Sequence, residues 1–162
     1  MNAIDQLGLL AEIAATFLGF IAIFLAVSGR DGRFAAGDGH FVQGLVLSCS
    51  QVILLGMAPG VAFLSFSAEQ VWPVASAVAA ACIGIQGLYI GWTQSRIHQR
   101  DEEHLHVLWH VPSWSFGGLA LGAMVVAIFY PGSAPTFYVT GLYFGLAVAL
   151  WCFLTIVFRR FL

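Results

Sequence analysis

The sequence contains no lysine and few charged residues of any kind. All six basic residues are arginines, and charged residues make up 9% of the 162-residue chain, whereas 60% of it is hydrophobic. Soluble domains carry roughly 25% charged residues, so this chain has too few to cover a water-soluble surface. The formal net charge of −2 also argues against a nucleic-acid partner. The composition indicates an integral membrane protein, with the lipid bilayer as its surroundings.

Disulfide frameworks and familiar catalytic motifs are absent as well. The three cysteines, Cys49, Cys82 and Cys152, all lie inside apolar runs, which indicates reduced, packed thiols. No G-x-S-x-G, Walker A or G-x-G-x-x-G pattern occurs. The N-terminal run begins with Asp5 and without a positive charge, so we interpret it as a retained helix, not as a signal peptide. These absences favour a non-catalytic protein over an enzyme.

Five apolar runs are long enough to cross a membrane as helices. They cover residues 7–28, 41–66, 71–94, 114–130 and 136–158. We therefore predict an all-α membrane protein, a five-helix bundle that forms a single domain over 1–162, with an inner loop at 95–113. Pro59 lies inside the second run, where it predicts a kink, and the Pro and Gly of "YPGSAP" at 130–135 predict a tight turn.

The arginines predict the orientation of the five spans. They follow the first, third and fifth runs, at Arg30, Arg33, Arg96, Arg100, Arg159 and Arg160. Five spans place all of them on one side, whereas four spans would divide them. Because arginines favour the cytoplasmic side, we expect the N-terminus outside and the C-terminus inside.

A carboxylate, Glu12, lies within the otherwise apolar or small stretch "LLAEIAATFLGF" at 9–20. Steps of three and four place it on one helix face with a small-residue stripe. The stripe consists of Gly8, Ala15, Gly19 and Ala22. Such a stripe lets another helix approach closely, and a glutamate facing lipid costs several kcal/mol. We expect Glu12 to face a helix interface or a small water-filled cavity, either as a packing carboxyl or as an ion or proton site, with Thr16 as a nearby hydrogen-bonding residue.

Glycines repeat on the other predicted helices too. The third run has Gly84, Gly87 and Gly91 on one face, and pairs four residues apart occur at 56/60, 118/122 and 141/145. Small residues at this spacing mark close contacts between membrane helices. One small bundle does not need so many close-packing faces, so we expect a homo-oligomer or a subunit of a membrane complex. The alternative is that every small-residue face packs against another helix within a single five-helix bundle.

Two glutamines, Gln51 and Gln86, lie at similar depth in the second and third runs. They either hydrogen-bond each other or line a polar pocket open to the cytoplasm. With Glu12 and Thr16 they form the candidate intramembrane polar site. A channel or transport role would use this site, whereas a purely structural role would use the small-residue faces.

The segment "RIHQRDEEHLHVLWHVP" at 96–112 holds the highest density of ionisable residues. On a helix, Glu103, His106 and His110 share one face, and two His with one Glu are a plausible zinc-like site. The glutamate of the H-E-x-x-H pattern is missing, however. We favour a solvated connector with arginine–acid pairs; the alternatives are a metal site there, or a haem with His40 and His110 as axial ligands, in a membrane enzyme or redox protein.

Three segments carry a resemblance to known sequences. "AEIAATFLGF" at 11–20, "GRDGRF" at 29–34 and "YVTGLYFGLAVALWCFLTIVFRRF" at 138–161 resemble a group of small bacterial polytopic inner-membrane proteins of unknown function. The resemblance implies a multi-pass location in the bacterial inner (plasma) membrane. It carries no catalytic or binding residue over to this chain.

Overall fold

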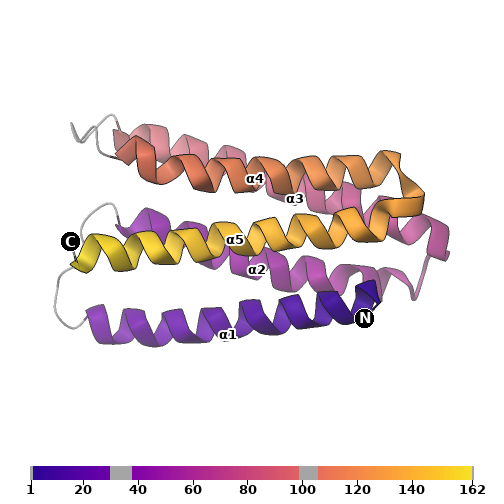
Figure 1. The fold of residues 1–162 in the computed structure, drawn as a ribbon, viewed down its shortest axis with the longest axis horizontal. Helices are drawn as coiled ribbons and strands as arrows, with labels where there is room; N and C mark the ends of the chain where they lie inside the picture. The colour runs from indigo at the N-terminus through magenta and orange to yellow at the C-terminus, as the bar shows by residue number, and fades with distance from the viewer. Residues whose placement is uncertain (1, 30–37, 99–105, 162) are drawn as a thin grey trace.

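The chain folds into long α-helices that run along one axis. The computed structural model describes residues 2–29, 38–98 and 106–161. The helices are α1 (Ala3–Gly29), α2 (Asp38–Ala62), α3 (Ala68–His98), α4 (His106–Phe129) and α5 (Ala134–Phe161), with a short 3₁₀ turn, η1 (Pro131–Ser133), before α5. Figure 1 shows that the two termini lie at opposite ends of the bundle. Helices α1, α3 and α5 end at its C-terminal end, where α2 and α4 begin.

Each of these helices is long and apolar enough to cross a membrane, and the described residues contain five such candidate spans. The prediction of an all-helical chain with five helices long and apolar enough to span a membrane is confirmed. The helix bounds differ from the predicted ones, because hydropathy marks the apolar part of a helix and not its ends. Helix α2 ends at Ala62, α3 extends to His98 and α4 begins at His106, so part of the predicted loop at 95–113 is helical.

The core lies where α2 and α5 face each other. Its most deeply buried side chains include Leu45, Cys49, Val52, Tyr138, Leu142 and Ala149. Helix α2 continues through Pro59, which has no N–H to donate to the carbonyl of Leu55, four residues earlier. The buried Tyr138 hydroxyl donates to this Leu55 carbonyl at 2.7 Å. A side chain of α5 therefore satisfies the acceptor that the proline leaves open.

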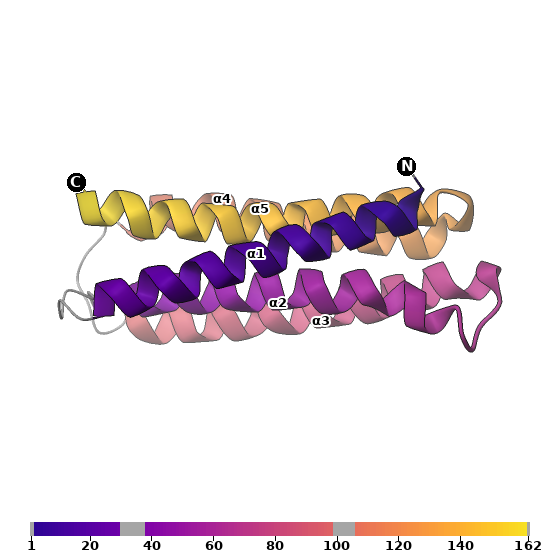
Figure 2. The same ribbon diagram turned by 90° about the horizontal axis from the view of Figure 1, so that it is seen from below.

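Helix α1 covers α2 and α5 from one side (Figure 2) and uses its bulky face to do so. Leu7, Leu10 and Ile21 are buried, and the rings of Phe17, Phe20 and Phe24 lie edge-on to the Phe153 ring of α5, at 5.3, 5.8 and 6.2 Å between centroids. Bulky side chains bury more apolar area than glycine and alanine do. This face therefore packs inward.

The small-residue stripe of α1 consequently faces outward. Gly8, Ala15, Gly19 and Ala22 are all exposed on the surface of the single chain. A Cβ added at Gly8 or Gly19 would meet no atom within 4 Å among the described residues. For α1, the alternative in which one bundle satisfies every small-residue face is therefore wrong.

Other glycines do mark close helix contacts. A Cβ added to Gly56 of α2 would lie 3.3 Å from the backbone oxygen of Leu7. One added to Gly141 of α5 would lie 3.2 Å from the backbone oxygen of Ala120 and 2.7 Å from Cε of Met124. The α1–α2 and α4–α5 contacts thus depend on glycine, as the spacing predicts for Gly56 and Gly141.

Candidate functional site

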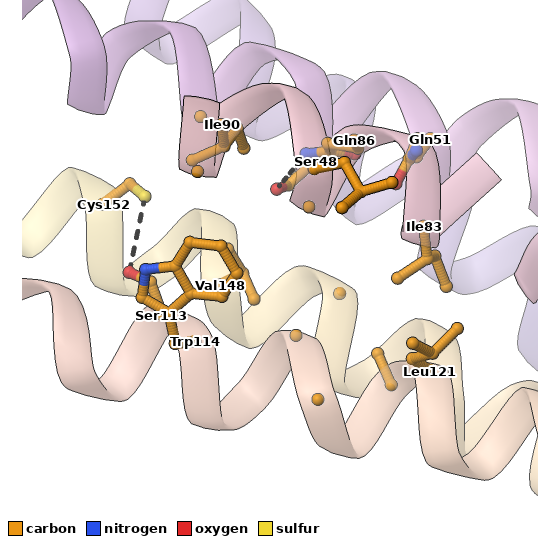
Figure 3. Close-up of a pocket in the computed structure, with 18 of the residues that line it drawn as sticks. Ser48, Gln51, Ile83, Gln86, Ile90, Ser113, Trp114, Leu121, Val148 and Cys152 are labelled. Atoms are coloured by element: carbon orange, nitrogen blue, oxygen red, sulfur yellow. Dashed lines mark hydrogen bonds between the residues drawn. The ribbon is translucent and has the colours of Figure 1, made fainter. Parts of the chain in front are cut away.

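A cavity of about 690 Å³ lies between α2, α3, α4 and α5. It extends from the C-terminal end of the bundle, at His40 and His110, to Gln51, Ile83 and Leu121 near mid-length. Figure 3 shows its labelled residues on facing helices around the space. The volume lies within the roughly 300–1,000 Å³ of small-molecule sites, so we take this cavity as the candidate functional site.

Missing side chains create much of this space. Gly84 and Gly87 line the cavity from α3, and Gly117 and Gly118 line it from α4. A Cβ added at any of these four positions would meet nothing within 4 Å in the described part of the chain. The glycine spacing at 118/122 predicts a close helix contact. That prediction is wrong for the described residues of one chain, none of which places an atom within 4 Å of a Cβ added to Gly118 or Gly122.

The polar groups of the cavity lie mainly on α2 and α3. Gln86 donates from Nε2 to the Ser48 hydroxyl oxygen at 3.2 Å, and Gln51 donates from Nε2 to the Cys82 carbonyl at 3.0 Å. The two glutamines thus bond to other partners, and both also line the cavity. Gln86 Oε1 is buried and has no hydrogen-bond partner among the residues described. An unpaired buried acceptor is costly, so Gln86 Oε1 is an unfavourable feature of this wall in the single chain.

The histidines at the C-terminal end of the cavity contact each other. The ring centroids of His40 and His110 are 5.6 Å apart, with an interplanar angle of 73°. His110 also stacks on Phe41, at 4.9 Å and 7°. His40 Nδ1 is buried without a hydrogen-bond partner within the described ranges. Since the two rings meet edge to face, a haem held between them would require them to separate.

Trp114 partly covers the cavity on the side where α3 and α4 meet. Its indole N–H donates to Gln94 Oε1 at 3.1 Å, and its ring would lie 3.0 Å from a Cβ added to Gly91. The lining residues Leu88, Trp92 and Trp114 are 77%, 54% and 47% exposed. The cavity therefore opens sideways between α3 and α4. Trp114 is not among the site residues predicted from the sequence, where its signal is an aromatic ring one turn from the glycine pair at 117/118.

Glu12 and Thr16 lie away from the cavity. Both are exposed on α1, and the Thr16 hydroxyl donates to the Glu12 backbone oxygen at 2.8 Å. The structure therefore brings Gln51 and Gln86 to one cavity and leaves Glu12 on the outer face of the bundle. The four residues do not form one site within a single chain.

The zinc-like cluster falls partly outside the described residues, which do not include Glu103 or the side chain of His106. Within the ranges that are described, no group of three or more His, Cys, Asp or Glu residues could hold a metal ion.

Comparison with known proteins found no family model, no curated protein and no solved structure that matches this chain.

Proposed function

We propose that this chain is a non-catalytic, transport-type protein of the bacterial inner membrane that takes a small molecule into the cavity between α2, α3, α4 and α5. The membrane assignment is supported by the five apolar helices, and the bacterial one by the sequence resemblance alone. The observation that carries the proposal is a glycine-walled cavity of about 690 Å³ whose lining also includes the polar residues Ser48, Gln51 and Gln86.

The cavity has the features of a binding site and not those of a packing defect. Interiors are normally packed to the density of organic crystals, with few voids larger than a water molecule. An apolar space with a few placed polar groups is instead typical of ligand sites. Transport across a membrane requires such a site at depth, and Ser48, Gln51 and Gln86 provide polar atoms at the middle of α2 and α3.

The outer face of α1 supports assembly of several copies. Lipid would cover Gly8, Ala15 and Gly19 poorly, and an exposed Glu12 in contact with acyl chains costs several kcal/mol. A second helix placed on this stripe removes both problems, because small residues permit close approach and a carboxyl can hydrogen-bond across the interface. Copies of this chain, or another membrane subunit, are the proposed partners on this face.

Native mass spectrometry of the protein, extracted gently from its own membrane, tests the proposal. The expected result is an oligomer mass with a bound small molecule in defined stoichiometry. A monomer that carries no small molecule would contradict both the proposed assembly and the proposed binding of a small molecule. An absorption spectrum of the same sample reports any haem.

A metal site at His40 and His110 is the second candidate. It is favoured by the contact between the two rings and by the unpaired His40 Nδ1, since imidazole nitrogens are common ligands of zinc and similar metals. Metal analysis of the purified protein decides between the metal site and the small-molecule site. Bound metal that His40→Ala abolishes would favour the metal site. A metal-free protein with a bound organic molecule would reject it.

A further inference from the structure

We propose that the cavity holds an acyl chain of an anionic phospholipid, which enters from the bilayer between α3 and α4 and lies with its phosphate beside Arg96 at the C-terminal end of the bundle. This inference rests on the proposed function and adds the chemical class of the small molecule and its route. Three features of the cavity support it: its length along the helices, its opening on the flank of the bundle and the cation at its edge.

The cavity is about as long as one leaflet of a bilayer is deep. Its lining runs from His40 to Gln51 along α2 and from His110 to Leu121 along α4, about 16 Å in each helix at a rise of 1.5 Å per residue. One leaflet contributes roughly half of the 30 Å hydrocarbon core. His40 and His110 lie in the first turn of their candidate membrane spans, so the cavity begins at the edge of the hydrocarbon and ends near its middle.

The deep part of the cavity suits a hydrocarbon chain. Ile83, Leu121 and Val148 contribute apolar side chains around the space (Figure 3), and the glycines of α3 and α4 contribute bare backbone. Gln51 and Gln86 use Nε2 on protein acceptors, and Gln86 Oε1 is buried within the wall. A hydrocarbon chain needs no hydrogen bond, and its contact with this wall supplies binding free energy through apolar burial.

The cavity opens where a lipid chain can enter it. Leu88 and Trp92 of α3 and Trp114 of α4 line the cavity and are exposed on the flank of the bundle. In a membrane this flank faces acyl chains, so a chain can move sideways between α3 and α4 while its headgroup stays at the membrane surface. A phospholipid therefore reaches the cavity without leaving its leaflet.

The charge at the edge of the cavity matches an anionic headgroup. The guanidinium carbon of Arg96 lies over the Trp92 ring, 4.1 Å from its centroid, and Trp92 lines the cavity. Arg96 is the last residue of its candidate span, at the same end of the bundle as His40 and His110. No Asp or Glu is among the described lining residues, so no carboxylate there repels a phosphate. Arginine binds phosphate through paired N–H donors, and basic groups at this level attract anionic lipids.

Two phospholipids with the same acyl chains test the headgroup. The delipidated protein in detergent is titrated in native mass spectrometry with dioleoylphosphatidylglycerol, which is anionic, or with dioleoylphosphatidylcholine, which is zwitterionic. We expect the anionic lipid to bind about fivefold more tightly, the effect of one arginine near a membrane surface. Arg96→Gln should abolish this preference. Arg159→Gln is the control, because it removes the same charge from the last turn of α5 at the same end of the bundle, and the preference should survive in it.

Two leucine variants locate the bound lipid. Gly118→Leu places a side chain in the cavity and should abolish binding of both lipids. Gly122→Leu changes a glycine that does not line the cavity, so it should bind both lipids as the wild-type protein does. Lipid binding that Gly118→Leu leaves unchanged, equal binding of the two lipids to the wild-type protein, or a preference that persists in Arg96→Gln would overturn the inference.

Failure of the inference and failure of the proposed function give different results. A co-purified molecule that is not a phospholipid and is lost from Gly118→Leu would overturn the inference and leave the proposed function standing. If the wild-type protein retains no molecule, lipid or other, that Gly118→Leu displaces, both are overturned.

Discussion

Tyr138 of α5 donates its hydroxyl hydrogen to the backbone carbonyl of Leu55 in α2 at 2.7 Å, and the residue that would normally donate to this carbonyl is Pro59. The bond is buried and joins the two central helices. It therefore allows α2 to keep a proline without leaving an unpaired acceptor in the core.

The first prediction concerns this bond. Tyr138→Phe should lower the free energy of unfolding by about 1–3 kcal/mol, because it leaves the buried Leu55 carbonyl unpaired. Unfolding in mixed micelles, followed by circular dichroism, measures the change. In a Pro59→Ala background the residue at 59 regains an N–H that can donate to Leu55, so Tyr138→Phe should cost clearly less there. The same loss in both backgrounds would show that the hydroxyl acts in some other way.

The second prediction compares two glycines of α5 that are four residues apart. Alanine normally stabilises a helix by up to ~1 kcal/mol relative to glycine. At Gly141 the added methyl would press on the Ala120 backbone oxygen and on Met124, so Gly141→Ala should destabilise by about 1–3 kcal/mol. At Gly145 the nearest atom is Val52 Cγ2 at 3.4 Å, an ordinary contact, so Gly145→Ala should be neutral or stabilising. Thermal unfolding of both variants in the same detergent measures the pair, and equal effects would contradict the assigned α4–α5 contact.

The third prediction tests assembly through α1. Ala15 and Ala81 are both exposed alanines, but only Ala15 belongs to the small-residue stripe beside Glu12. Ala15→Leu should therefore reduce the oligomer to smaller species in light scattering of the detergent complex, whereas Ala81→Leu should leave it intact. Both variants should keep the helix content of the parent. If neither variant loses the oligomer, the interface between copies lies elsewhere on the protein.

Glu12 allows a finer test of the same interface. Glu12→Gln keeps hydrogen-bonding capacity and removes the charge, whereas Glu12→Leu removes both. If the carboxyl acts in packing, the glutamine variant should still assemble and the leucine variant should assemble less well; chemical crosslinking in native membranes reports the outcome. Assembly that depends on the charge would instead favour an ion or proton site at Glu12.

The sequence was sufficient for the helices because hydropathy over a long run depends on composition alone. It was also sufficient to separate the small face of α1 from the bulky one. It could not tell which face packs inward, since that depends on partners such as Phe153, which lies more than a hundred residues away along the chain.

The cavity could not be predicted for a related reason. Glycine spacing is the same for a close helix contact and for an open space, and the difference lies in what another helix places opposite. Trp114 covers Gly91, Ala120 approaches Gly141, and nothing in the described chain fills the space at Gly84 or Gly118. By contrast, the meeting of His40 and His110 follows from topology, because antiparallel helices bring the starts of α2 and α4 to one end.

The most direct test of the proposed cavity site is the amount of small molecule that two leucine variants retain in native mass spectrometry. Gly118 and Gly122 lie one turn apart on α4, both are exposed and both have space for a side chain, but only Gly118 lines the cavity. We expect a bound small molecule in the wild-type protein and in Gly122→Leu, and none in Gly118→Leu. Equal retention by all three proteins, or no bound molecule in any of them, would contradict it.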